Sequence, residues 1–161
     1  MTSREFFAKA FADERPRFVR VLRALPGDRL EYTPHPRSTP ARNIAWLLAT
    51  ELHDACELVD HGQASFAASA APASLDEIVR TYERHAAGLQ ERLGRLPAAA
   101  WEQPAKFLVN GQVAWESPLG DMLWGFLFDA IHHRGQLSTY IRPMGGKVPS
   151  IYGPSGDDPG Q

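Results

Sequence analysis

Asp129 and His133 are the residues whose types and spacing most clearly suggest chemistry. They lie four positions apart within residues 128–137, Phe-Asp-Ala-Ile-His-His-Arg-Gly-Gln-Leu, so a helix would bring both to one face. A carboxylate and an imidazole on a core-like helix face can together hold a divalent metal ion. A direct Asp–His hydrogen bond, or a half-buried histidine with other partners, fits the same spacing, and this stretch alone leaves the alternatives open.

Glu51 provides a third candidate ligand. If residues 38–61 form a helix that turns about 100° per residue, Ile44, Leu48 and Leu58 belong to one apolar arc, and Glu51 falls inside it. A carboxylate on a core-facing arc needs a partner, because burying it alone costs several kcal/mol. A metal ion shared with the fourth helical stretch would satisfy it, and so would an arginine from another helix.

The remaining histidines and the single cysteine give weaker indications. His53 projects away from the apolar arc, beside Trp46, which is typical of a surface or interface residue. His85 lies on an apolar face and is interpreted as a core histidine that could approach the site. Cys56 has no obvious base near it in the pattern, so we predict no nucleophilic triad.

Four amphipathic stretches must position these residues. Apolar side chains recur at steps of three to four residues in each stretch, which indicates helices. The predicted helices cover residues 3–25, 38–61, 74–96 and 118–144. Pro16 lies inside the first of them and is expected to bend or split it near Arg15. Ser74 with Glu77 three residues later is a capping-box pattern for the start of the third.

Between the third and fourth helices, residues 106–115 contain two β-like runs around Asn110-Gly111, the strongest short hairpin signal. After about residue 147 a tail follows whose apolar side chains, Val148, Ile151 and Tyr152, suggest that it folds back. The predicted fold is therefore an all-α four-helix bundle with a small β-hairpin excursion. Residues 1–161 are expected to form one domain.

Composition excludes several classes of function. The chain has 161 residues and a formal charge of −2, with its basic residues scattered, so nucleic-acid binding is not expected. It has a single cysteine, which cannot form an internal disulfide and fits a reducing compartment. Its first residues lack the apolar core of a signal peptide, and its apolar runs are too short to cross a bilayer. The expected location is the cytoplasm.

Several phrases of the sequence resemble the DinB/YfiT-like family. The most specific is His-His-Arg-Gly-Gln-Leu at 132–137, followed by Tyr-Ile-Arg-Pro-Met-Gly at 140–145 and Val-Pro at 148–149. A weaker match is Asn-Ile-Ala-Trp-Leu-Leu-Ala at 43–49. With the four-helix layout, the resemblance covers most of the chain.

The resemblance implies a site of three histidines around a divalent metal, often nickel, zinc or iron. His133 matches the second histidine of the family's HxxxH, but Asp129 stands at the first. Leu47 falls at or near the third position, and Glu51 lies one turn later on the same face. A Glu51–Asp129–His133 site would be harder and more anionic than a three-histidine one.

Some relatives in this family are S-transferases or isomerases that use low-molecular-weight thiols such as mycothiol or bacillithiol. The resemblance therefore implies a metal-dependent enzyme with a small thiol cosubstrate. The alternative, from another class, is a catalytically inert dimeric bundle in which the polar cluster is structural.

Two further features of the sequence concern packing. Trp46, Trp115 and Trp124 provide more aromatic surface than one small bundle easily covers, and relatives are often dimers, so we predict a homodimer. Gly135 lies inside the fourth helical stretch, where glycine costs about 1 kcal/mol relative to alanine, and is expected to permit close helix approach.

Overall fold

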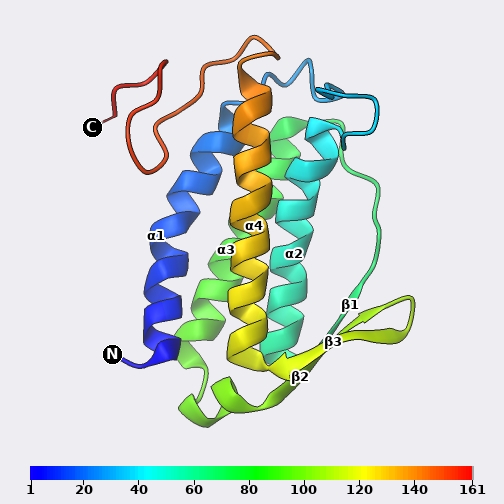
Figure 1. The fold of residues 1–161 in the computed structure, drawn as a ribbon. Helices are drawn as coiled ribbons and strands as arrows, with labels where there is room; N and C mark the ends of the chain where they lie inside the picture. Colours follow the sequence, from blue (N-terminus) through cyan, green and yellow to red (C-terminus); the bar gives the residue numbers. More distant parts are fainter. Residues whose placement is uncertain (161) are drawn as a thin grey trace.

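The computed structural model describes residues 1–160, and helices dominate it (Figure 1). They are α1 (Ser3–Arg23), α2 (Ala41–His61), α3 (Leu75–Arg95) and α4 (Leu119–Ile141), with a short 3₁₀ helix, η1 (Ala98–Glu102). These bounds lie within the stretches predicted from apolar spacing. The ends differ by up to three residues, and helix ends are the least certain part of a prediction from periodicity.

Side chains near the helix ends explain where α1 and α3 begin. The Thr2 hydroxyl oxygen accepts a hydrogen bond from the backbone N–H of Glu5, and the Glu5 carboxylate accepts one from the backbone N–H of Thr2, which completes a capping box. Ser74 likewise accepts from the backbone N–H of Glu77 at the start of α3. Gly62 ends α2 in the left-handed conformation, with φ of 67°.

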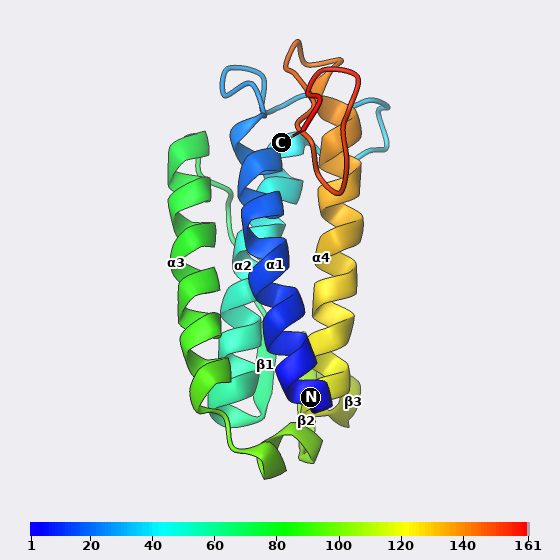
Figure 2. The same cartoon turned by 90° about the vertical axis from the view of Figure 1, so that its left-hand side faces the viewer.

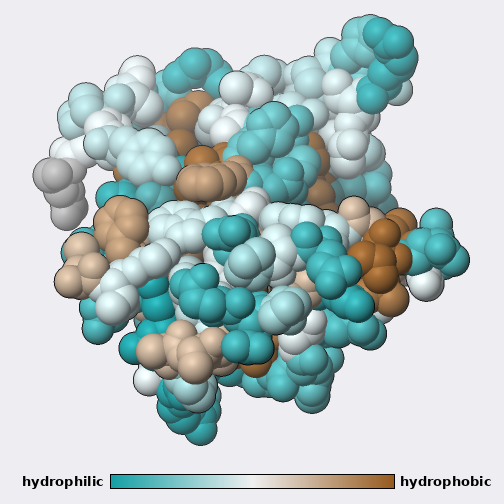
Figure 3. Space-filling model, turned by 60° about the horizontal axis from the view of Figure 1, so that its bottom comes forward, coloured by the Kyte–Doolittle hydropathy of each residue, from teal (hydrophilic) through white to brown (hydrophobic). Residues whose placement is uncertain are grey.

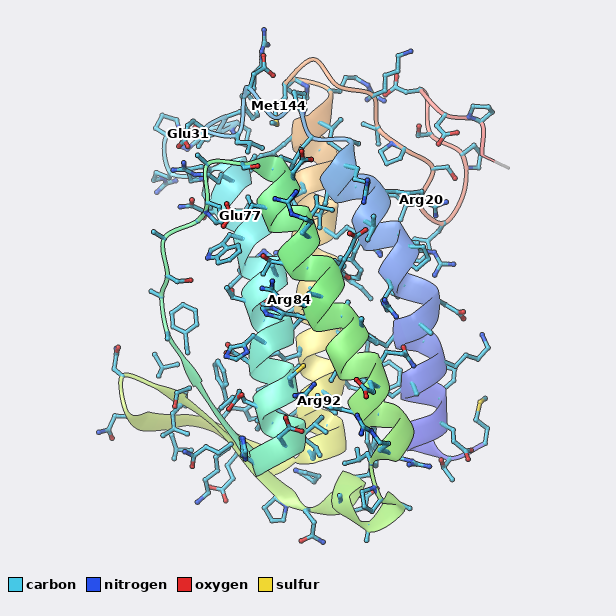
Figure 4. The ribbon with its side chains drawn as sticks, turned by 180° about the vertical axis from the view of Figure 1, so that it is seen from behind. Arg20, Glu31, Glu77, Arg84, Arg92 and Met144 are labelled. Carbon is cyan, nitrogen blue, oxygen red and sulfur yellow. The ribbon has the colours of Figure 1, made fainter. Side chains whose placement is uncertain are left out.

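The helices form a four-cornered bundle in which α1 and α4 run in one direction and α2 and α3 in the other (Figures 1 and 2). Helix α2 packs against α3 and α4, and α1 packs against the same two helices. Since α2 and α3 are parallel, the chain must return along the length of the bundle between them. The view from behind shows α3 in front, with Arg84 and Arg92 on it (Figure 4).

A small sheet at one end of the bundle corrects the all-α prediction. It contains β1 (Gln63–Phe66), β2 (Pro104–Val109) and β3 (Gln112–Pro118), in that order. The predicted hairpin is present, and both Asn110 and Gly111 have positive φ at its turn, 51° and 74°. The parallel pairing of β1 with β2 was not predicted, because β1 lies in a polar linker and its partner is about forty residues away.

Pro16 does not split α1, so that part of the prediction is wrong. The helix is continuous from Ser3 to Arg23. Phe7, Phe11 and Phe18 are almost fully buried on one face of it. Packing of this face against the bundle outweighs the single hydrogen bond that proline removes, which is how tertiary contacts commonly override local preference.

The C-terminal tail folds back, as predicted. Val148 and Ile151 pack against the core, while the ring of Tyr152 remains largely exposed. The carboxylate of Asp157 accepts hydrogen bonds from the backbone of Val148 and from the guanidinium of Arg142. The tail is therefore held by apolar contacts and by its own carboxylates together.

The surface at the sheet end of the bundle is mostly hydrophilic, with separate hydrophobic areas (Figure 3). Within residues 1–160, no helix has the length and apolar character that crossing a membrane requires.

Gly135 does not mediate close helix packing, so that prediction is wrong. A Cβ atom placed on it would meet nothing within 4 Å. The close approaches occur at Gly120 and Gly125, where a Cβ would lie 2.2 Å from the rings of Trp101 and Trp115 respectively. In both cases a tryptophan from outside the helix lies directly on the backbone of α4.

We expect Gly125→Ala to destabilise the protein by about 1–3 kcal/mol, because the new methyl group overlaps the ring of Trp115. Gly135→Ala is the matched control in the same helix. It should raise stability by about 0.5–1 kcal/mol, since alanine favours the helix and the site has room. Chemical unfolding of both variants measures the difference. If Gly125→Ala is as stable as Gly135→Ala, the ring of Trp115 moves aside without a cost in folding free energy.

Candidate metal centre

The three residues singled out in the sequence come together between α2 and α4. Glu51 lies in the middle of α2, and Asp129 and His133 lie one turn apart on α4. One ligand atom from each lies within 4.8 Å of the other two. Nε2 of His133 is 3.3 Å from Oδ2 of Asp129. Glu51 and His133 are half-buried, whereas Asp129 is exposed, so the cluster opens to solvent on one side.

No arginine among residues 1–160 pairs with Glu51, although the sequence left that alternative open. Its Oε2 atom is buried and makes no hydrogen bond with any residue in the range 1–160. Burial raises the pKa of Glu51 to about 9, and the adjacent carboxylate of Asp129 adds to the rise. A buried carboxylate in this state would be stabilised in its charged form by a cation placed beside it.

Gln136 fixes the orientation of His133. Its Oε1 atom is 2.7 Å from Nδ1 of the imidazole, so Nδ1 is the nitrogen suited to donate a hydrogen bond to the amide. In neutral His133 the lone pair then lies on Nε2, which faces Asp129. Histidines that bind metals commonly have such a partner on the second ring nitrogen.

The donor set fits a divalent cation. Two carboxylates and one imidazole supply oxygen and nitrogen ligands of the kind that zinc, iron and nickel accept. The orphaned Oε2 of Glu51 and the oriented imidazole of His133 both agree with this assignment. Because only three protein ligands converge, a bound ion would keep at least one position for another ligand.

His53 and His85 both lie outside the cluster, which answers for His85 the possibility that the sequence left open. His53 is exposed, and its ring centroid is 5.5 Å from that of His85. His85 is half-buried, with Nδ1 2.8 Å from the carbonyl oxygen of Ala49. Neither belongs to the three-residue cluster.

A pocket adjoins the cluster between α2, α4 and the sheet. Its empty volume is about 830 Å³, which includes solvent at its mouth, and Glu51 and Asp129 belong to its wall. Asp54, one turn after Glu51 on α2, also lines it and is 8% exposed. The sequence analysis missed Asp54. Its spacing of three from Glu51 placed it near the same face, and that was the available signal.

Sequence reasoning also missed a buried ion pair on the other side of α4. The guanidinium of Arg134 is 2% exposed and forms an ion pair with Glu14 of α1. Tyr152 of the tail joins them: its hydroxyl lies 2.6 Å from the Arg134 guanidinium and 3.0 Å from the Glu14 carboxylate. The guanidinium also lies over the ring of Phe18, 4.6 Å from its centroid.

We expect metal-free protein to lose stability as the pH rises from about 4.5 to about 9. The pKa of Glu51 is 4.5 in the unfolded chain and about 9 in the folded protein. Between these two pH values the unfolded chain has therefore released the proton that the folded protein still holds. Each pH unit in that window then favours unfolding by at most about 1.4 kcal/mol.

Chelator-treated protein unfolded by urea between about pH 7 and pH 9 measures this slope. Burial raises the pKa of Asp54 only to about 6, so that residue contributes little in this range. Glu51→Gln should flatten the dependence, whereas Glu57→Gln on the same helix should not. A wild-type slope of zero would show that Glu51 is ionised in the folded protein.

The fold and the site define a four-helix bundle with a carboxylate–histidine cluster between two of its helices. Residues 1–160 match the DinB family, and the chain belongs to this family. No protein of curated function matches the sequence significantly.

Solved structures agree on the fold. A DinB-like protein from Bacillus cereus superposes with a TM-score of 0.77 at 19% identity, over 92% of this chain and 97% of the other. A DinB-like protein from Bacillus subtilis superposes with a TM-score of 0.69 at 19% identity, over 88% of this chain and 92% of the other. A mycothiol-dependent maleylpyruvate isomerase gives 0.57 at 12% identity, over 91% of this chain and 62% of that one.

Proposed function

We propose that this protein is a divalent-metal-dependent enzyme, with zinc, nickel or iron held by Glu51, Asp129 and His133. The observation that carries the proposal is their convergence within 4.8 Å around a buried, unpartnered Glu51 oxygen. Membership of the DinB family supports it. The proposed enzyme is a single domain acting in the cytoplasm.

We further propose thiol transfer as the reaction, with a low-molecular-weight thiol as cosubstrate. The structural likeness to an isomerase that depends on mycothiol supports this choice. A bound divalent cation would lower the pKa of a thiol placed beside it. Glu51, Asp129 and His133 would hold the ion, Gln136 would keep the imidazole oriented, and the adjoining pocket would shield the reacting sulfur from water.

Metal analysis of protein purified without a histidine tag tests the metal part. About one equivalent of zinc, nickel or iron per chain is expected, from the single three-residue cluster. The assay for transfer is thiol-dependent consumption of an electrophile such as monochlorobimane, with and without chelator. Protein that is metal-free and fully stable, and does not take up added metal, would instead support the catalytically inert bundle.

The homodimer stays a prediction, and we propose an exposed row of aromatic side chains on α1 and α4 as the surface where a second copy would bind. Phe6 of α1 and Phe128 of α4 are 51% and 62% exposed, and Trp124 lies between them with ring centroids at 5.7 and 5.6 Å. Trp46 and Trp115 are half-buried against the protein itself. An exposed aromatic row on two parallel helices can pair with its own copy across a two-fold axis.

We expect sedimentation at micromolar concentration to show a species of twice the 17.8 kDa chain. Phe128→Glu should convert it to a monomer, because a charge replaces an aromatic side chain at the interface, while Phe66→Glu, at a separate exposed phenylalanine, should not. Wild-type protein that sediments as a monomer would contradict the prediction.

A further inference from the structure

Four aromatic rings line the pocket beside the metal centre, and each comes from a different element. They belong to Phe66 of β1, Phe107 of β2, Trp115 of β3 and Phe126 of α4. Phe126 meets Phe107 edge-on at 5.3 Å and stacks with Trp115 at 6.3 Å. The wall thus forms only when the sheet lies against α2 and α4, with β1 on α2, β3 on α4 and β2 touching both helices.

Asp54 gives this aromatic pocket a charge. It is 8% exposed, lines the pocket, and makes no hydrogen bond or ion pair with any residue described in the structure. Burial raises the pKa of Asp54 to about 6, which still leaves the carboxylate ionised at neutral pH. Asp54 has no hydrogen-bond partner among the described residues, yet neither of its carboxylate oxygens is among the fully buried atoms that lack one, so these oxygens face the open pocket, where a cationic ligand can pair with them.

The pocket remains negative whether or not a metal is bound. None of the described residues that line it is basic. Without metal, the lining carboxylates of Asp54 and Asp129 are not balanced by any positive side chain of the wall. With a divalent ion held by Glu51 and Asp129, those two carboxylates balance the ion, and the charge of Asp54 remains.

We propose that this pocket binds an organic ammonium ion, with the charged nitrogen beside Asp54 and its apolar substituents against the rings of Phe107, Trp115 and Phe126. Aromatic faces attract cations electrostatically, and a carboxylate adds direct charge pairing. The proposal concerns the chemical class of ligand, goes beyond the metal chemistry, and does not require the ion.

Three small probes of the same shape test the charge requirement. Choline carries a trimethylammonium group, 3,3-dimethylbutan-1-ol replaces it by an uncharged tert-butyl group, and 3,3-dimethylbutanoate carries a negative charge instead. Nuclear magnetic resonance titration, followed at the indole N–H of Trp115, measures their affinities. Choline is expected to bind about tenfold more tightly than the alcohol, and the carboxylate not at all.

Variants locate the binding. Asp54→Asn should weaken choline binding about tenfold and leave the alcohol unchanged, because only the charge is removed. Asp121→Asn, which removes an exposed carboxylate of α4 outside this pocket, is the matched control and should bind choline like the wild type. Trp115→Ala should weaken choline and the alcohol alike, followed at other resonances.

The titrations are performed on the protein as purified and again after treatment with chelator. A preference for choline in both preparations supports the proposal even if the metal site proves wrong. Equal affinities for choline and the alcohol, no binding of choline, or an Asp54→Asn variant that binds like the wild type would each overturn it. Thermal unfolding of the variants confirms that they are folded.

Discussion

Protein carrying His133→Ala is expected to lose more than about 100-fold in affinity for zinc or nickel, since removal of even an outer partner of a metal ligand typically costs 10–100-fold. The imidazole is the only nitrogen ligand of the cluster, and without it two carboxylates remain, of which Asp129 is exposed. Isothermal titration with each metal measures the change.

Two further variants make the result specific. His53→Ala removes an exposed imidazole from α2, outside the cluster, and should leave metal affinity unchanged. Gln136→Leu removes the partner of Nδ1 and should cost about 10–100-fold. Metal binding that survives His133→Ala but is lost in His53→Ala would place the site elsewhere.

Asp129→His, in contrast to His133→Ala, should raise the affinity of the site for zinc and nickel. It restores an imidazole at the position where the family pattern has one, and imidazole suits nickel and zinc better than a carboxylate does. We expect higher affinity for both ions than in the wild type. An unchanged preference would show that Asp129 does not bind the metal.

The helices could be predicted from sequence because their apolar faces are regular. The same periodicity located Glu51, whose charge interrupts an apolar arc, and the structure places it beside Asp129 and His133. It did not locate β1, because the pairing of Gln63–Phe66 with β2 depends on how the bundle folds and not on local pattern. For the same reason the aromatic wall of the pocket was not predicted.

The spacing of apolar residues in α1 and α4 also contains a signal for the buried pair of Glu14 and Arg134. Glu14 stands between Asp13 and Arg15, and a run of charges reads as a solvated face. Its position relative to Phe11 and Phe18, however, three residues after one and four before the other, places it on the buried face of α1. Arg134 has the matching place on α4, three residues before Leu137. Two opposite charges in two apolar stripes predict a buried pair.

Glu14→Ala is expected to destabilise the protein by about 3–5 kcal/mol, because it leaves the guanidinium of Arg134 buried without its carboxylate. Tyr152 alone remains as a partner, and a neutral hydroxyl does not compensate a buried charge. For a chain of this size the midpoint of thermal unfolding should fall by roughly 10 °C. Asp13→Ala, which removes an exposed ion pair with Lys9, is the control and should change little.

A double variant separates the cost of an unpaired charge from the loss of packing. Glu14→Leu combined with Arg134→Met fills the same space with apolar side chains and removes both charges, so it should recover most of the stability. Because Tyr152 then loses both hydrogen-bond partners, the tail should be cleaved faster by proteases although the bundle is stable. If the double variant is as unstable as Glu14→Ala, the attraction between Glu14 and Arg134 stabilises the fold. The loss of stability in Glu14→Ala would then not come from the unpaired charge of Arg134.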